Sequence, residues 1–280
     1  MSIRETTRED AARALSAARA PRRWGAWYIA EHRFRNMKAY TQTVIATGIG
    51  SPLMYLFAMG VGLASLVDAN VEQNGLSVSY LVFVAPALLA MAAFEAAAEE
   101  FSYPIMLGFK WNPTFTGMGA SPVTPGQIID GQVIAVTARI VVTTALYFVF
   151  MLLFGAVPGN LGWISLFSAV LTGLAFGTLL MAYVSTLEND SGQIAMVMRF
   201  LVLPLTLFSG TVFPLTQLPW FLQWIGWLSP LWHGTELGRV LSYGYAEPVW
   251  LSMLHIVYLL LLTTLGWMLA RRVAARRLNR

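Results

Sequence analysis

Long apolar stretches, separated by short polar breaks, are the main feature of this chain. A helix needs roughly 20 mostly apolar residues to cross the hydrocarbon core of a membrane. We therefore expect an all-α integral membrane protein, with six transmembrane helices in one membrane domain over residues 43–270. The predicted spans are at about residues 43–67, 79–99, 127–157, 163–187, 193–212 and 249–270.

The fourth predicted span carries Gly173 and Gly177 at the GxxxG spacing. Two missing side chains on one helical face let a neighbouring helix approach closely. Chance glycines in an apolar helix are the alternative.

The basic residues lie mostly at the two ends of the chain. Nine of the 18 Lys and Arg residues fall within the first 38 positions, and five more fall within the last ten. Basic segments beside spans are typical of cytoplasmic flanks, so the net charge of +4 does not indicate a nucleic-acid partner. We expect residues 1–20 to be a cytoplasmic arm and residues 271–280 a basic cytoplasmic tail, in a protein of the plasma (inner) membrane. Two ends on one side require an even number of crossings, which six satisfies.

Residues 21–40 mix aromatic rings with basic side chains. Such a mixture is typical of a helix in the membrane interface, with its rings in the acyl boundary and its bases on lipid phosphates. Trp24, Trp27 and Phe34 are the predicted membrane contacts, and Arg33 is among the predicted phosphate contacts. The alternative is a basic flank that only orients the first span.

Three indoles on one helical face mark the segment that follows Phe213. Trp220, Trp224 and Trp227 stand at i, i+4 and i+7, and prolines divide the segment into short pieces. Irregular backbone at membrane depth persists only where protein buries it or where it lines a cavity. We expect re-entrant half-helices that dip into the outer leaflet and close the outward end of a pathway. An aromatic belt at the interface is the alternative, and the two are compatible.

The break between the second and third predicted spans, about residues 100–126, is rich in aromatic residues and has a single cation. Exposed aromatic residues bordered by Gly and Pro are typical of a contact surface. We therefore expect a short helix that docks into a partner protein on the cytoplasmic side. The alternative is a loop folded against the protein's own helix ends. The aromatic residues are Phe101, Tyr103, Phe109, Trp111 and Phe115.

Four ionisable residues interrupt apolar runs on the predicted cytoplasmic half: Glu95, Asp130, Arg139 and Arg199. Charges inside a membrane are costly and normally face a cavity or one another. One interpretation is structural pairing, such as Glu95 with Arg139. The other is a polar site that admits the head group of an amphiphile. A proton-coupled secondary transporter, with Glu95, Asp130 and Arg139 as a relay, is an alternative function.

The composition excludes several kinds of functional site. The chain is 57% hydrophobic and 11% charged, its mean hydropathy is +0.61, and it contains no Cys. Disulfides, thiolate metal sites and cysteine nucleophiles are excluded, and three scattered His residues predict no metal site. No phosphate-binding loop, dinucleotide turn or hydrolase motif occurs. We expect neither an enzyme nor a cofactor bound by this chain; an acid–base pair of His233 and Glu236, at i and i+3, is the alternative.

Two segments carry a family resemblance: LFSGTVFPLTQLPWFLQWIGWLSPLWHGTELGR and YPIMLGFKWNPTFTGMGASPVTPGQI. They resemble the permeases of the second class of ABC exporters, in the nodulation-protein-J-like branch that includes drug, lipo-oligosaccharide and polysaccharide exporters. The resemblance covers roughly residues 25–270. It implies six spans, with an amphipathic interface helix before the first, a cytoplasmic coupling helix between the second and third, and extracellular re-entrant helices before the sixth.

The resemblance also implies how such a permease works. Two permeases, either copies or homologues, assemble with two ATPase subunits that bind ATP and Mg, and closure of those subunits pushes on the coupling helices. The implied function is outward movement of a hydrophobic or amphiphilic substrate such as a drug, lipid or glycolipid. The implied ATPase-interface residues are Gly108, Phe109, Lys110, Trp111, Asn112, Pro113 and Thr114. The implied outer-gate residues are Phe208, Ser209, Gly210, Phe213 and Pro214.

Overall fold

The structure, a computed structural model, describes residues 3–42, 50, 54–58, 62, 71–73 and 76–279. The first predicted span, residues 43–67, lies mostly outside the described residues. That span therefore stays a prediction.

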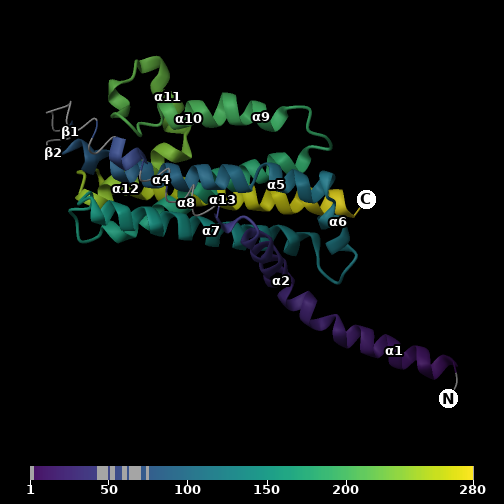
Figure 1. Ribbon diagram of the computed structural model, residues 1–280. Coiled ribbons are helices and arrows are strands. Elements are labelled where there is room, and N and C mark those ends of the chain that lie inside the picture. The colour runs from purple at the N-terminus through teal and green to yellow at the C-terminus, as the bar shows by residue number, and fades with distance from the viewer. Residues whose placement is uncertain are drawn as a thin grey trace.

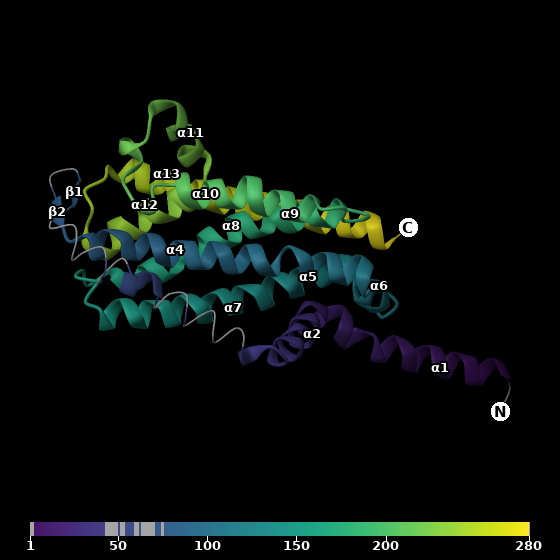
Figure 2. The ribbon, with the colours of Figure 1, turned by 45° about the horizontal axis from the view of Figure 1, so that its top comes forward.

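Four long apolar helices form a bundle in the described part of the chain (Figures 1 and 2). α4 (Tyr80–Glu100), α7 (Pro125–Leu153), α8 (Ser165–Thr186) and α13 (Val249–Leu278) are long and apolar enough to cross a membrane. α8 is central to the bundle because it packs against the other three helices. The predicted all-α membrane architecture is confirmed at this level.

Close packing of α8 on α4 depends on two glycines. A side chain at Gly173 would meet the carbonyl group of Ala93, and a side chain at Gly177 would meet Ala97 and Phe101. The GxxxG spacing therefore marks a real helix contact rather than a chance pair of glycines.

A shorter apolar helix follows α8 in the chain. It consists of α9 (Gln193–Val197), a π-helical segment (Met198–Val202) and α10 (Leu203–Phe208). The fifth predicted span extended to residue 212, but the helix ends at Phe208. Gly210 has a φ of +67°, a left-handed conformation that turns the backbone out of the helix.

Short elements gather at one end of the bundle, which we call the α12 end (Figure 1). α11 (Trp220–Leu228) leads into α12 (Pro230–Tyr243), and α12 packs against α4, α8 and α13. β1 (Val71–Gln73) and β2 (Leu76–Val78) form an antiparallel hairpin at this end. Two 3-10 turns complete the connections, Gly162–Ile164 before α8 and Leu215–Gln217 before α11.

The opposite end of the bundle, which we call the α6 end, carries the connection between α4 and α7 (Figure 1). It comprises α5 (Tyr103–Met106), a π-helical segment (Leu107–Trp111) and α6 (Thr114–Gly119). The carboxyl end of α13 reaches the same end of the bundle.

Two helices precede the bundle. α1 (Ile3–Ala17) extends away from it, and α2 (Arg19–Lys38) packs along α7 (Figure 2). Ile29 on α2 fits against the bare backbone of Gly131 on α7. Both ends of the described chain lie toward the α6 end (Figure 1).

The third predicted span, residues 127–157, is shifted in the structure. α7 begins earlier because Thr124 and Gln127 form a capping box at its first turn. It ends at Leu153, since Gly155 adopts a φ of +69° two residues later.

The predicted basic tail, residues 271–280, is helical over most of its length. It continues α13 as far as Leu278. Arg277 Nη1 donates hydrogen bonds to the carbonyl groups of Ser185 at 2.9 Å and Leu187 at 2.7 Å, at the end of α8. Cations favour helix carboxyl ends, so this contact fastens the last turns of the two helices together.

Candidate functional site

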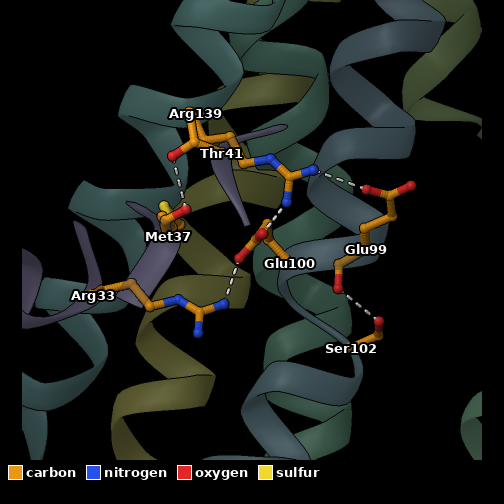
Figure 3. A network of polar contacts seen from close by, with 7 residues as sticks. All are labelled: Arg33, Met37, Thr41, Glu99, Glu100, Ser102 and Arg139. Atoms are coloured by element: carbon orange, nitrogen blue, oxygen red, sulfur yellow. Dashed lines mark hydrogen bonds and ion pairs between the residues drawn. The ribbon is translucent and has the colours of Figure 1, made fainter. Parts of the chain in front are cut away.

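A buried network of charged side chains joins α2, α4 and α7 (Figure 3). Glu100 accepts hydrogen bonds from Arg33 Nη2 at 2.5 Å and from Arg139 Nη1. Arg139 Nη2 also donates to Glu99 Oε2 at 3.0 Å. The side chain of Glu100 is only 3% exposed. One carboxylate therefore compensates two guanidinium groups away from bulk water.

The position of the two acids in α4 explains why cations gather there. Glu99 and Glu100 stand in the last turn of the helix, where the helix dipole disfavours negative charge. Arg33 from α2 and Arg139 from α7 offset that cost. Ser102 Oγ donates to the carbonyl group of Glu99 at 3.0 Å and satisfies one of the free carbonyls of the helix end.

Two predictions about these residues are wrong. Arg139 pairs with Glu99 and Glu100 rather than with Glu95, because the two acids one turn further along α4 lie within its reach. Arg33 does not lie on lipid phosphates, since its side chain is buried against Glu100.

A cavity of about 680 Å³ opens beside the charged network. It lies between α2, α4, α5, α7 and the π-helical segment Met198–Val202. Its size falls within the usual range for small-molecule sites. The polar residues that line it are Arg33, Tyr40, Glu95, Glu99, Glu100, Ser102, Tyr103 and Arg139, and the apolar ones are Ala98, Pro104, Leu107, Met198 and Val202.

The other two predicted intramembrane charges do not line this cavity. Asp130 accepts from Trp267 Nε1 at 2.8 Å and pairs with Arg271 at 3.4 Å. Arg199 is exposed. Asp130 stands nine residues before Arg139 on α7, about 13 Å along the helix axis. The structure therefore does not assemble Glu95, Asp130 and Arg139 into one relay.

The predicted ATPase-interface residues differ in exposure and fall into three groups. Lys110, Trp111, Asn112 and Pro113 are exposed at the α6 end. Gly108 and Phe109 are buried in this structure, and Thr114 is half-buried.

Buried aromatic rings support the exposed part of this segment. Phe109 packs edge-on against Phe115 at 4.9 Å, and the Arg277 guanidinium lies 4.4 Å from the centre of the Phe109 ring. Phe101 is also buried, whereas Tyr103 and Trp111 stack on the outside. The predicted aromatic contact surface is thus wrong for three of its five rings, which face the protein's own helix ends.

A second buried ion pair holds the α12 end together. Arg239 on α12 is fully buried, and its Nη1 donates to Glu236 at 2.6 Å. Its Nη2 donates to the carbonyl group of Gly210 at 2.8 Å, and its guanidinium lies 3.8 Å from the centre of the Phe83 ring on α4. Sequence reasoning missed Arg239; the Glu and Arg at i, i+3 were the available signal.

Arg239 thereby positions part of the predicted outer gate. Ser209 and Pro214 are buried along with Gly210, and Ser209 Oγ donates to Ser229 Oγ at 2.6 Å. Phe208 and Phe213 are half-buried. The segment between α10 and α11 is therefore tied to α12 by both charge and hydrogen bonds.

His233 and Glu236 do not form an acid–base pair, the alternative that their spacing allowed, because Glu236 pairs with Arg239. His233 instead belongs to a chain of imidazoles that links α12 to α13. Its Nδ1 lies 2.6 Å from His255 Nδ1, and its Nε2 lies 3.0 Å from the carbonyl oxygen of Trp227. His255 Nε2 lies 2.9 Å from a Glu247 oxygen.

The proton count of this chain is fixed by its geometry. A carbonyl group only accepts, so His233 Nε2 carries a hydrogen. The contact between the two Nδ1 atoms has room for one hydrogen, and that between His255 and Glu247 for another. An additional proton on His233 would place hydrogens on both Nδ1 atoms and break their contact. No group of three metal-ligating side chains that could hold an ion occurs among the described residues.

Acidification from pH 7 to pH 4 is expected to weaken the contact between α12 and α13. Burial and the neighbouring His255 lower the pKa of His233 from 6.5 to about 4. The folded protein therefore favours neutral His233. This contribution to the free energy of unfolding is complete above pH 6.5, and about 3 kcal/mol of it is lost as the pH falls toward 4. Burial raises the pKa of Glu247, but hydrogen bonds from His255 and Ser252 outweigh it and leave this pKa below its usual value. Its contribution is lost in the same direction. Thermal unfolding midpoints across this pH range measure the effect.

A His233→Gln variant should show a flatter pH dependence than the wild type. The matched control is His32→Gln, at an exposed position of α2, which should leave the decline unchanged. A wild-type decline in the His233→Gln variant would contradict the prediction.

The predicted membrane-contact aromatics are mostly exposed. Trp220, Trp224 and Trp227 lie on the outside of α11, and Trp24 and Trp27 lie on the outside of α2. Phe34 is half-buried. This exposure suits contact with lipid.

The chain is similar to one family of transport proteins. A family model described as "ABC-2 type transporter" matches residues 26–243. Nodulation protein J of Rhizobium leguminosarum bv. viciae is 30% identical over 254 residues, with 88% of this chain and 93% of that protein covered. Nodulation protein J of Rhizobium meliloti (strain 1021) is 29% identical, with 87% and 91% covered. That of Neorhizobium galegae is 30% identical, with 88% and 92% covered.

Proposed function

This chain belongs to the ABC-2 type transporter family, and from that premise we propose that it exports a hydrophobic or amphiphilic substrate with the help of a separate ATPase. The family makes it a transport permease rather than a catalyst. Beyond membership of the family, we propose the outward direction of transport, the amphiphilic substrate and the ATPase partner. The cavity of about 680 Å³ is lined by both charged and apolar residues, and it would admit a drug or the head-group region of a lipid or glycolipid.

The proposed complex contains two permeases, copies or homologues, and two ATPase subunits that hold ATP and Mg. The proposed contact on this chain is the exposed segment of Lys110, Trp111, Asn112 and Pro113. Force applied there would pass through Phe109 to the joined ends of α8 and α13.

The proposed orientation places the α6 end and both termini in the cytoplasm of an inner-membrane protein. The basic residues at the two ends of the chain support this orientation. The α12 end would then face outward, with α11 and α12 as re-entrant helices and residues 208–214 near the outer gate.

The exposure of Trp111, beside buried supporting rings, is the observation that carries the docking proposal. Tagged permease purified from its own membranes should bring with it vanadate-sensitive ATPase activity. A Trp111→Ala variant should retain about a tenth of that activity or less, because buried Trp anchors dominate protein interfaces.

Trp163→Ala is the matched control for this experiment. Trp163 is exposed to nearly the same extent as Trp111, at 54% against 52%. It lies in the 3-10 turn Gly162–Ile164, which packs against α12 and is therefore remote from the α6 end. Equal loss in both variants would contradict a specific contact. Transport that survives ATP depletion and stops when the proton gradient collapses would favour the secondary transporter instead.

A further inference from the structure

The cavity beside the charged network has one carboxylate more than it has cations. Among the described residues, three acids and two guanidinium groups line it. Glu100 accepts from both guanidinium groups, and Glu99 accepts from one. Glu95, which also lines the cavity, has no ion pair among the described residues.

The undescribed part of the first predicted span cannot supply the missing cation. Residues 43–70 contain no Lys, Arg or His. Arg199 lies between two cavity-lining residues in sequence but does not line the cavity itself. A partly buried carboxylate without a cation is unfavourable unless it takes up a proton, so Glu95 would gain from contact with a positive group that comes from outside the chain.

The remaining walls fit the rest of such a ligand. Leu107, Met198 and Val202 offer apolar surface, and Tyr40 and Tyr103 offer rings to which a cation is attracted. The Nε atoms of Arg33 and Arg139 are buried without a hydrogen-bond partner and would by themselves favour an anion. Both guanidinium charges are already compensated, however, and an added anion would face three carboxylates.

We infer that this cavity binds an amphiphile with one cationic group, and that Glu95 is the residue that contacts that group. This inference rests on the proposed function in one respect only, which is that the bound ligand is the exported substrate. Binding itself requires no ATPase.

Two probes of matched shape and opposite charge test the inference. Tetraphenylphosphonium and tetraphenylborate both carry four phenyl rings around a central atom. Binding of each, in radiolabelled form, is measured to the full chain in lipid nanodiscs, with empty nanodiscs as the background. We expect saturable binding of tetraphenylphosphonium and a loss of at least about tenfold in its affinity in Glu95→Gln. Binding of tetraphenylborate should not fall in that variant.

Two further variants guard the result. Glu95→Asp keeps the charge and should keep most of the affinity for tetraphenylphosphonium. Glu31→Gln removes an acid that pairs with Arg35 on the exposed face of α2 and should leave affinity unchanged. Thermal unfolding of each variant shows whether the fold is retained.

Three results would overturn the inference: no saturable binding of tetraphenylphosphonium, equal affinity in wild type and Glu95→Gln, or saturable binding of tetraphenylborate alone. The last would make the cavity an anion site through the free guanidinium Nε atoms. The proposed function fails under a different result. If the chain binds tetraphenylphosphonium but recruits no ATPase, the cation site stands and the exporter function is contradicted.

Discussion

A Glu100→Gln variant is expected to lose about 3–5 kcal/mol of stability, because it leaves buried guanidinium groups without a counter-charge. Arg33 has no other ion pair among the described residues, and Arg139 keeps only Glu99. An amide offers one acceptor oxygen where the carboxylate offers two, and it carries no charge. The free energy of unfolding in mixed detergent micelles measures the loss.

The neighbouring acid provides the matched control. Glu99→Gln removes the same chemical group one residue away, but the Glu99 side chain is 63% exposed. Exposed ion pairs contribute little, so we expect a loss of about 1 kcal/mol or less. Equal losses in the two variants would mean that burial of Glu100 does not determine the energy of this network.

The bundle was predictable because length and apolarity are local properties of the sequence. The predicted spans at residues 79–99 and 163–187 differ from α4 and α8 by one or two residues at each end. The predicted ends of helices were wrong where a single residue stops the helix, as the left-handed Gly155 and Gly210 do. The last helix also continues beyond the predicted span, through residues 271–278, because Ala, Arg and Leu favour helix.

The charged network was only partly predictable. Glu95 and Arg139 were recognised as costly charges in apolar helices, and both line the cavity. Their pairing could not be predicted, because it depends on how α2 and α7 meet α4 in space. Arg33 and Glu100 are 67 residues apart in the sequence, and no local pattern connects them.

The side-chain orientations in the aromatic connection between α4 and α7 could not be predicted from local sequence either. Its composition indicated a contact surface, and Lys110 and Trp111 are indeed exposed. Phe109 and Phe115 have the same apolar character but face inward. Hydrophobicity alone cannot distinguish a ring that meets a partner from one that meets its own helix ends.

Replacing the buried cation of the α12 end should have a second large effect. Arg239→Met is expected to cost about 3–5 kcal/mol, since it strands the buried Glu236 carboxylate and leaves the carbonyl group of Gly210 without its donor. The matched control is Arg199→Met, which removes an exposed arginine from an apolar helix and should change stability by about 0.5 kcal/mol or less.

A double-mutant cycle separates the charge effect from the packing effect at this end. If the stranded carboxylate causes most of the loss, adding Glu236→Gln to Arg239→Met should recover about 1–3 kcal/mol of the unfolding free energy. Recovery would show that Arg239 acts on the outer end through its charge. No recovery, with the double variant as unstable as the sum of its parts, would assign the loss to the contacts with Phe83 and Gly210. In that case the segment between α10 and α11 would be held mainly by packing and backbone hydrogen bonds, rather than by the ion pair.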